Sequence, residues 1–278
     1  MHKDIFDRLE RFYDAVPRDV AGVEEHGGLV LFVREGVGWP FYARPRIGAT
    51  EAPSLADVSS ARERQRELGL PEAFEWVHET TPELLAVARS AGLNVLEAPL
   101  MVLDPAALPD PATLSDVPVR VLAADAPDLA ADVAARRAVA AVAFGAAGTA
   151  PGTAGPAERD AAVTELELAA LDEERVRIAD GRRISALAGT PTEGALASGM
   201  AMRVDDVAEI AGVATLPAAR RRGMGAALTA TLAHELLAAG TGLVFLSAGS
   251  EEIARVYLRV GFRRIGTACI AEPTALIP

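Results

Sequence analysis

Lysine is nearly absent from this chain of 278 residues, and Lys3 is its only example. All other positive side chains are arginines. A phosphate-binding loop of the kind that depends on a lysine is therefore excluded. Schiff-base chemistry is also not expected, because the single lysine lies next to the N-terminus.

Cysteine is equally scarce, with Cys269 as its only example. A single cysteine excludes an intrachain disulfide and a cysteine-rich metal site, and it fits a reducing compartment. The first residues, MHKDIFDRLERFYDAV, carry charges throughout and lack the apolar segment of a signal peptide. No apolar run reaches the length of a membrane-spanning helix. We therefore expect a cytoplasmic protein with no membrane partner and no metal.

Positive charge is the minority sign, and the formal net charge is −12. A protein that binds nucleic acid must present a positive face to the phosphates. No nucleic-acid partner is therefore expected. Half of the residues are hydrophobic and about a quarter are charged, which is typical of a globular chain with one large domain or two ordinary ones.

A proline-rich stretch divides the chain at residues 105–118, PAALPDPATLSDVP, where no hydrophobic period is sustained. We predict an N-terminal domain over 1–112 and a C-terminal domain over 117–278. Residues 73–103 and 242–271 both predict a strand, a helix and a strand. This faint repeat indicates either a duplication or the general frequency of such units. The N-terminal half has no glycine loop, since its first long helix follows GATEAPS.

The stretch TLPAARRRGMGAALTA, residues 215–230, joins a predicted strand to a predicted helix. Its glycines and the free amides of the helix start would form an anion-binding site suited to a pyrophosphate. Three interpretations compete: a plain glycine turn with solvated arginines, a dinucleotide-binding loop, and a pyrophosphate loop for acyl-CoA. The dinucleotide motif requires a third glycine where this chain has Leu228, so the chain matches that motif only in part.

Two linked signatures favour the acyl-CoA interpretation. Arg220, Gly223 and Gly225 resemble the Q/R-x-x-G-x-G/A signature of the GNAT superfamily of acyl-CoA N-acyltransferases, and VYLRVGF at 256–262 is similar to its Y-x-x-x-G-F block. The resemblance covers about residues 117–272. It implies an α/β fold with a mixed, mostly antiparallel sheet whose central parallel strands splay apart, and the N-terminal half would be a degenerate second copy.

The resemblance also implies cofactor contacts along the splayed strand and the loop. The Val213 N–H would donate to the thioester carbonyl and to the oxyanion formed from it. Loop amides would wrap the pyrophosphate, and Ser250 stands where many members have an asparagine. The residues implied to contact the cofactor are Val213, Ala214, Thr215, Arg220, Arg221, Arg222, Gly223, Met224, Gly225, Ala226 and Ser250.

Two further residues are candidates for proton transfer. Tyr257 matches the tyrosine that protonates the departing CoA thiolate, although it could instead be an aromatic packed between helix and sheet. Glu209 lies where some members have a glutamate base, although it could equally be a carboxylate on a solvent face. Alternation along the strand would place Glu209, Ala211 and Val213 on one side, toward the cleft.

We therefore expect an N-acetyltransferase that moves an acetyl group from acetyl-CoA to a primary amine in a ternary complex, and the amine would belong to a small molecule or a peptide. Helices predicted at 126–144 and 158–180 would shape the acceptor pocket, and the small-residue loop at 145–157 is expected to be mobile. The alternatives are a non-catalytic acyl-CoA sensor and a nucleotide-cofactor enzyme. A homodimer is left open, because the sequence carries no signal for oligomeric state.

Overall fold

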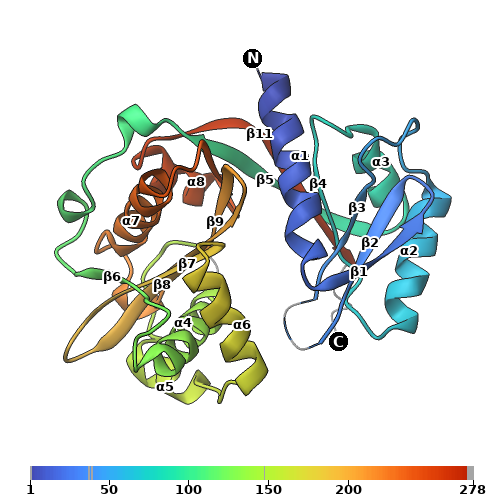
Figure 1. Ribbon diagram of the computed structural model, residues 1–278. Coiled ribbons are helices and arrows are strands. Elements are labelled where there is room, and N and C mark those ends of the chain that lie inside the picture. The colour runs from blue at the N-terminus through green and yellow to red at the C-terminus, as the bar shows by residue number, and fades with distance from the viewer. Residues whose placement is uncertain (1, 37, 39, 147, 274–278) are drawn as a thin grey trace. The chain divides into compact units, whose positions relative to one another are not determined.

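The structure is a computed structural model that describes residues 2–36, 38, 40–146 and 148–273 (Figure 1). It divides into two compact units, Met1–Leu100 with Ile265–Pro278, and Met101–Arg264. This division differs from the predicted domains, 1–112 and 117–278. Two long strands, β5 (Leu93–Leu103) and β11 (Phe262–Pro273), each begin in one unit and end in the other, which no local composition signal could reveal.

The first unit has the strand order β1-β2-β3-β4-β11-β5. The pairs β1–β2, β2–β3 and β4–β11 are antiparallel, and β3 pairs parallel with β4. Helices α2 and α3 cover one face with a hydrophobic cluster that includes Phe74 and Trp76. Helix α1 lies on the other face, where Arg44 of β3 contacts Tyr13. The elements are α1 (His2–Arg18), β1 (Ala21–His26), β2 (Leu29–Arg34), β3 (Ala43–Pro45), α2 (Leu55–Glu67), β4 (Phe74–Val77) and α3 (Glu83–Ser90).

The second unit has the strand order β5-β10-β9-β8-β7-β6. Strands β6 to β9 pair antiparallel, and β9 pairs parallel with β10, so the predicted mixed sheet with a central parallel pair is confirmed. The elements are β6 (Val119–Val121), α4 (Leu129–Phe144), α5 (Pro156–Ala162), α6 (Leu168–Ala179), β7 (Arg183–Thr190), β8 (Gly194–Val204), β9 (Val207–Thr215), α7 (Met224–Ala238), β10 (Leu243–Ser247) and α8 (Glu251–Leu258).

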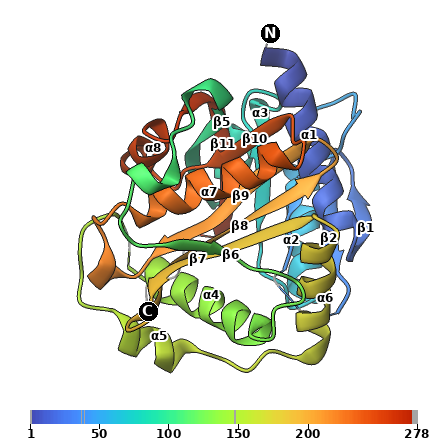
Figure 2. The same ribbon diagram turned by 60° about the vertical axis from the view of Figure 1, so that its left-hand side comes forward.

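Helix α7 covers one face of the second unit's strands, and α4 and α6 cover the other (Figure 2). The α7 face is fixed by Leu232, whose Cδ1 would lie 3.2 Å from a Cβ on Gly199 of β8. The opposite face is fixed by Ser198, whose hydroxyl donates to the Arg136 carbonyl of α4. Neighbouring residues of β8 thus point to opposite helices, as strand geometry requires.

The helical stretch predicted over 158–180 is divided into α5 and α6, and residues 163–167 between them are not helical. The predicted repeat is present as β4-α3-β5 and β10-α8-β11. Both of its helices are followed by a left-handed glycine, Gly92 (φ 79°) and Gly261 (φ 95°), which ends the helix without a Cβ penalty. Among the described residues, no helix is both long and apolar enough to cross a membrane.

Candidate functional site

The central feature of the site is the divergence of β9 from β10. The parallel register joins Val207, Ala208 and Glu209 to Leu243, Val244 and Phe245, and in the described chain it ends there although β9 continues to Thr215. Past Glu209, the edge of β9 that faced β10 is therefore released from the ladder. Backbone donors and acceptors on such an edge are available to an extended ligand.

A bulge interrupts β9 on its other edge as well. Ala211 pairs with Met200 and Ala214 with Ser198, so Gly212 and Val213 together oppose Gly199. Gly212 adopts a left-handed conformation (φ 63°), which a glycine accepts most readily. A glycine inside a strand pattern is the sequence signal for such a bulge, and Gly212 provides it within β9.

Because of the bulge, the side chains of β9 do not alternate as the sequence predicted. Met200 faces α4, because its sulfur lies 3.1 Å from Nη1 of Arg136. Ala211 pairs with Met200, and Glu209 pairs with Met202, so Ala211 and Glu209 share that face. Val213 instead packs against the α7 face, with its Cγ2 3.3 Å from a Cβ position on Gly199. The extra residue reverses the alternation, so Glu209 and Val213 point to opposite faces.

The loop after β9 brings free amides to this strand. Gly223 begins α7 in a left-handed conformation (φ 76°), and among the described residues no side chain caps the helix. The first helical hydrogen bond runs from the Ala227 amide to the Gly223 carbonyl. The amides before Ala227 thus have no acceptor within the helix, and they carry the positive end of the helix dipole. A Cβ on Gly225 would lie 3.9 Å from Val213 and 3.8 Å from Thr215, so the amides open beside the end of β9.

Arg220 has a role that the sequence did not predict. Its guanidinium donates to four backbone carbonyls: Thr215 at 3.4 Å, Ala150 at 3.1 Å, Ala143 at 3.0 Å and Ala146 at 2.7 Å. The side chain at the signature position thus fastens the end of α4 and the small-residue loop to the end of β9.

The small-residue loop at 145–157 makes two further backbone hydrogen bonds. The amide of Gly152 donates to the carbonyl of Pro217, and the amide of Ala218 donates to the carbonyl of Ala154. The described residues of the stretch predicted to be mobile, 145–157, are therefore held by the segment between β9 and α7. Its low-complexity composition gave no sign of this, because the loop binds Arg220, Pro217 and Ala218 through its own backbone groups.

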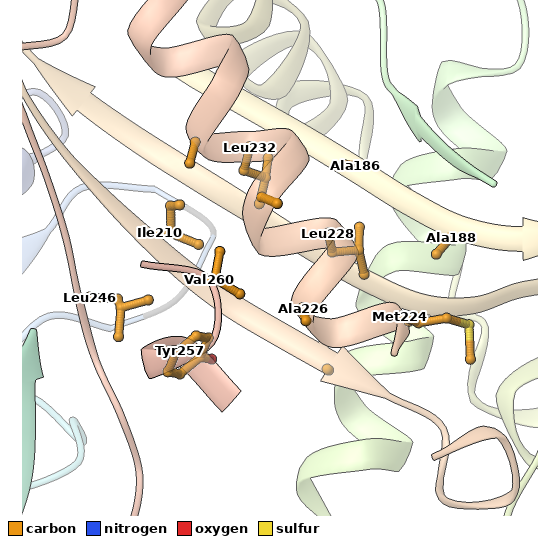
Figure 3. Packing of buried hydrophobic residues seen from close by; sticks show 14 of the residues in the cluster. Ala186, Ala188, Ile210, Met224, Ala226, Leu228, Leu232, Leu246, Tyr257 and Val260 are labelled. Carbon is orange, nitrogen blue, oxygen red and sulfur yellow. The ribbon is translucent and has the colours of Figure 1, made fainter. Parts of the chain in front are cut away.

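The remaining loop residues divide into exposed and buried ones. Arg221 and Arg222 are exposed, and Arg222 lies 3.9 Å from the Glu193 carboxylate. Met224 and Ala226 are buried in the main core beside Leu228 (Figure 3). Their side chains are therefore structural, and only their backbone faces the site.

Tyr257 of α8 is buried in the same core, near Ile210 of β9 and Leu246 of β10 (Figure 3). Its ring meets that of Phe262 edge-on, with centroids 6.1 Å apart. Burial raises the pKa of the Tyr257 hydroxyl to about 12. The hydroxyl therefore keeps its proton at neutral pH and can act as a donor. Packing and donation are compatible here, because the ring and the hydroxyl serve different contacts.

Ser250 caps α8, since its hydroxyl accepts from the Ile253 amide at 3.2 Å.

Helix α2 of the first unit differs from α7, because the start of α2 is capped by its own side chains. Ser54 accepts from the Asp57 amide at 3.2 Å, and Asp57 accepts from the Ser54 amide at 2.9 Å and the Gly28 amide at 3.2 Å. A carboxylate thus occupies the place where an anionic ligand would bind.

The comparisons agree with this geometry. A family model described as "FR47-like protein" matches residues 190–271, which include β9, the loop and α8. A GCN5-related N-acetyltransferase from Kribbella flavida is 23% identical, with a TM-score of 0.66 and 96% of each chain covered. One from Sphaerobacter thermophilus is 18% identical, with a TM-score of 0.56, 93% of this chain and 84% of that chain covered. No curated protein matches the chain.

A tandem GNAT protein from the clavulanic acid biosynthesis pathway is also similar, at 14% identity and a TM-score of 0.53, with 88% of this chain and 78% of that chain covered. These matches define the class: the chain has the acyl-CoA N-acyltransferase fold of the GCN5-related N-acetyltransferases. The resemblance predicted from the arginine–glycine loop and the VYLRVGF block is confirmed. The similarity to a tandem protein agrees with the predicted duplication.

Proposed function

We propose that the second unit is an acyl-CoA-dependent N-acyltransferase that moves an acetyl group from acetyl-CoA to a primary amine. One observation carries the proposal: β9 separates from β10 after Glu209, at the point where the uncapped start of α7 opens beside Val213 and Thr215. A thioester arm laid along the released edge of β9 would bring its pyrophosphate to the α7 amides.

The reaction begins with attack of the neutral amine nitrogen on the thioester carbonyl carbon. The carbonyl oxygen becomes an oxyanion, which the Val213 N–H at the bulge stabilises. The C–S bond then breaks, and the thiolate takes a proton from Tyr257. The products are the amide and free CoA, and no acyl-enzyme forms. Cys269, the one cysteine, is fully buried in the core of the first unit and does not enter the reaction.

The ammonium that results from the attack must lose a proton, and we assign this role to Glu209, acting directly or through a water molecule. Glu209 is half-buried on the α4 face of β9. The amine would then approach from the α4 and α6 side, while the CoA lies along the released edge. Arg220 positions the loop, and the exposed Arg221 and Arg222 supply charge for the CoA phosphates.

A second candidate function is a non-catalytic acyl-CoA sensor on the same fold. It is favoured by the engagement of the Ser250 hydroxyl as the cap of α8 and by the burial of Tyr257 in the core. Calorimetry with acetyl-CoA, CoA and NAD tests binding, and CoA release across a panel of amines tests turnover. Binding of acetyl-CoA with release of CoA supports the enzyme. Binding without release for any amine favours the sensor, and failure to bind acetyl-CoA refutes both.

A further inference from the structure

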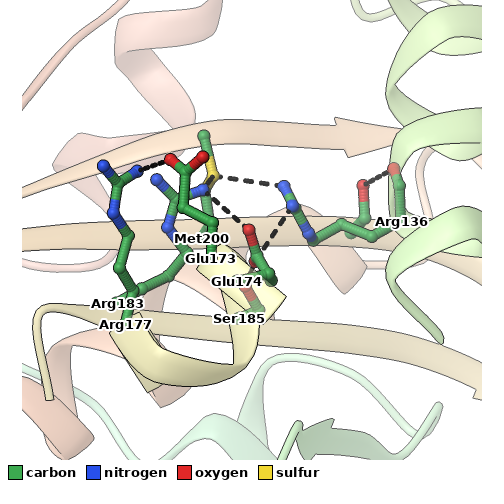
Figure 4. Close-up of polar contacts among 8 residues, drawn as sticks. Arg136, Glu173, Glu174, Arg177, Arg183, Ser185 and Met200 are labelled. Carbon is green, nitrogen blue, oxygen red and sulfur yellow. Dashed lines mark hydrogen bonds and ion pairs between the residues drawn. The ribbon is translucent and has the colours of Figure 1, made fainter. Parts of the chain in front are cut away.

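A cluster of buried polar side chains lies on the α4 and α6 face of the second unit (Figure 4). It joins Arg136 of α4, Glu174 of α6, Arg183 and Ser185 of β7, and Met200 of β8, and we call it the Arg136 cluster. Arg136 and Glu174 are only 8% and 4% exposed. Buried ionised groups of this kind are expensive unless their charges and hydrogen bonds are matched.

Within the Arg136 cluster a single carboxylate serves three donors. Glu174 accepts from Nη2 of Arg136 at 3.1 Å, from Nη1 of Arg183 at 3.3 Å and from the Ser185 hydroxyl at 3.1 Å. The two guanidiniums also direct Nη1 at the Met200 sulfur, at 3.1 Å and 3.3 Å. A thioether is a weak and uncharged acceptor, so it does not balance the second positive charge.

The cluster therefore holds an excess of positive charge. Burial lowers the pKa of Arg136, the Glu174 carboxylate opposes that effect, and the neighbouring guanidiniums of Arg183 and Arg137 add to it. The adjacent carboxylate of Glu173 is bound by Arg177 at 2.9 Å. The Nε atoms of Arg136 and Arg183 are both buried, and neither has a hydrogen-bond partner among the described groups. Two strong donors and one unmatched charge are thus left over.

The position of the cluster links it to the proposed reaction. Met200 pairs across the ladder with Ala211, and Met202 pairs with Glu209, so the cluster shares the face of the proposed base. These four residues are all half-buried, and a solute can therefore approach this strip of β8 and β9.

We infer that the acceptor amine carries an anionic group, a carboxylate in the simplest case, which Arg136 and Arg183 bind while its amine faces Glu209. This inference rests on the proposed function and names the class of acceptor for it. A charge-assisted contact to a guanidinium is among the stronger hydrogen bonds. A substrate that lacks the anionic group would leave the buried guanidinium donors without a partner. The acceptor class is thus an amino acid or another amino carboxylate.

The test is CoA release from acetyl-CoA with a series of amino carboxylates, from glycine to 6-aminohexanoate, each compared with its own carboxamide. We expect the best carboxylate to exceed its carboxamide in kcat/KM by about 10- to 100-fold. Equal use of both members of every pair overturns the inference and leaves the proposed function standing. If neither series releases CoA while another primary amine of the panel does, the inference fails alone. If no primary amine releases CoA, the proposed function fails, and the inference fails with it.

Arginine variants separate ligand binding from packing. Arg183→Gln should raise the KM for the carboxylate about 10-fold or more, leave the KM for acetyl-CoA unchanged and abolish the preference over the carboxamide. Arg183→Lys, which keeps the charge, should restore part of the preference. Arg175→Gln is the matched control, since Arg175 is an exposed arginine of α6 paired with Asp172 at 2.9 Å.

A purely structural role for the Arg136 cluster predicts a different result. In that case Arg183→Gln would lower the melting temperature and leave the preference for the carboxylate intact, which would overturn the inference. Arg136→Gln is the stronger variant where it folds, because Arg136 is the more deeply buried of the two. Arg183→Gln carries the test without it.

Discussion

The carbonyl oxygen of Leu114 occupies the space that a side chain on Gly223 would need, since a Cβ there would lie 1.8 Å from that oxygen. The neighbouring Ser115 hydroxyl donates to the Arg222 carbonyl at 2.8 Å. The proline-rich stretch that the sequence suggested as a domain boundary therefore lies against the start of α7. Gly223 is required both for its left-handed conformation and for this close approach.

Gly223→Ala should destabilise the protein for two reasons. The strained backbone alone costs about 1–3 kcal/mol, and the clash with Leu114 adds to that cost. Acetyl-CoA affinity should fall as well, since the loop must move. Gly225→Ala is the control, because its Cβ meets only ordinary contacts at 3.8 and 3.9 Å. It should be neutral or stabilising by up to about 1 kcal/mol. Thermal melting and calorimetry measure both effects, and equal melting temperatures for the two variants would contradict the argument.

Tyr257→Phe should lower kcat on the order of 100-fold with little change in the dissociation constant of acetyl-CoA. The phenylalanine keeps the edge-on contact with Phe262, so stability should change little. Because the pKa of Tyr257 is raised to about 12, wild-type kcat should not decline through loss of this proton at pH 7–9. Steady-state kinetics over that range are the measurement. Unchanged turnover in the variant would remove Tyr257 from the acid role.

Arg220→Lys should destabilise the protein by about 1–3 kcal/mol, because one ammonium cannot satisfy the four carbonyls that the guanidinium reaches. Arg221→Lys, at an exposed neighbour, should leave the melting temperature unchanged. Limited proteolysis should cut residues 145–155 faster in the Arg220 variant only. A loss of acetyl-CoA affinity without any loss of stability would instead assign the Arg220 side chain to the cofactor.

Glu75 of β4 gives the first unit a pH dependence. Burial raises the pKa of Glu75 to about 7, against the lowering effect of Arg44, and the Glu272 carboxylate adds to the rise. The folded state then holds this proton to higher pH than the unfolded state, whose glutamate has a pKa near 4.5. The unfolding free energy should therefore fall as the pH rises from about 4.5 to about 7.

Glu75→Gln should remove that decline and stabilise the protein at pH 8. Glu63→Gln, at an exposed site on α2, is the control and should leave the pH profile as it is. Urea unfolding from pH 4 to 8 measures both. A decline of equal size in the Glu75 variant would show that other groups are responsible.

Several features could be predicted from the sequence because their causes are local. The glycine after each repeat helix, the alternating strand–helix pattern and the arginine–glycine loop all follow from a few neighbouring residues. The helical pattern over 158–180 predicts most of α5 and α6, but it continues through residues 163–167, where the structure has no helix. Strict alternation along β9 does not include the bulge at Gly212 and Val213, so it places Glu209 and Val213 on one face although they lie on opposite faces.

The sequence by itself determined the class of fold and the place of the anion-binding site. The spacing of glycines and apolar residues specifies the turn and the helix that follows it. Only the tertiary structure decided what each side chain does there. Arg220 binds carbonyls from residues more than 60 positions away, and Arg136 and Arg183 meet at one carboxylate of a third element. Such contacts depend on which faces of distant elements meet, and that is set by the packing of the whole unit.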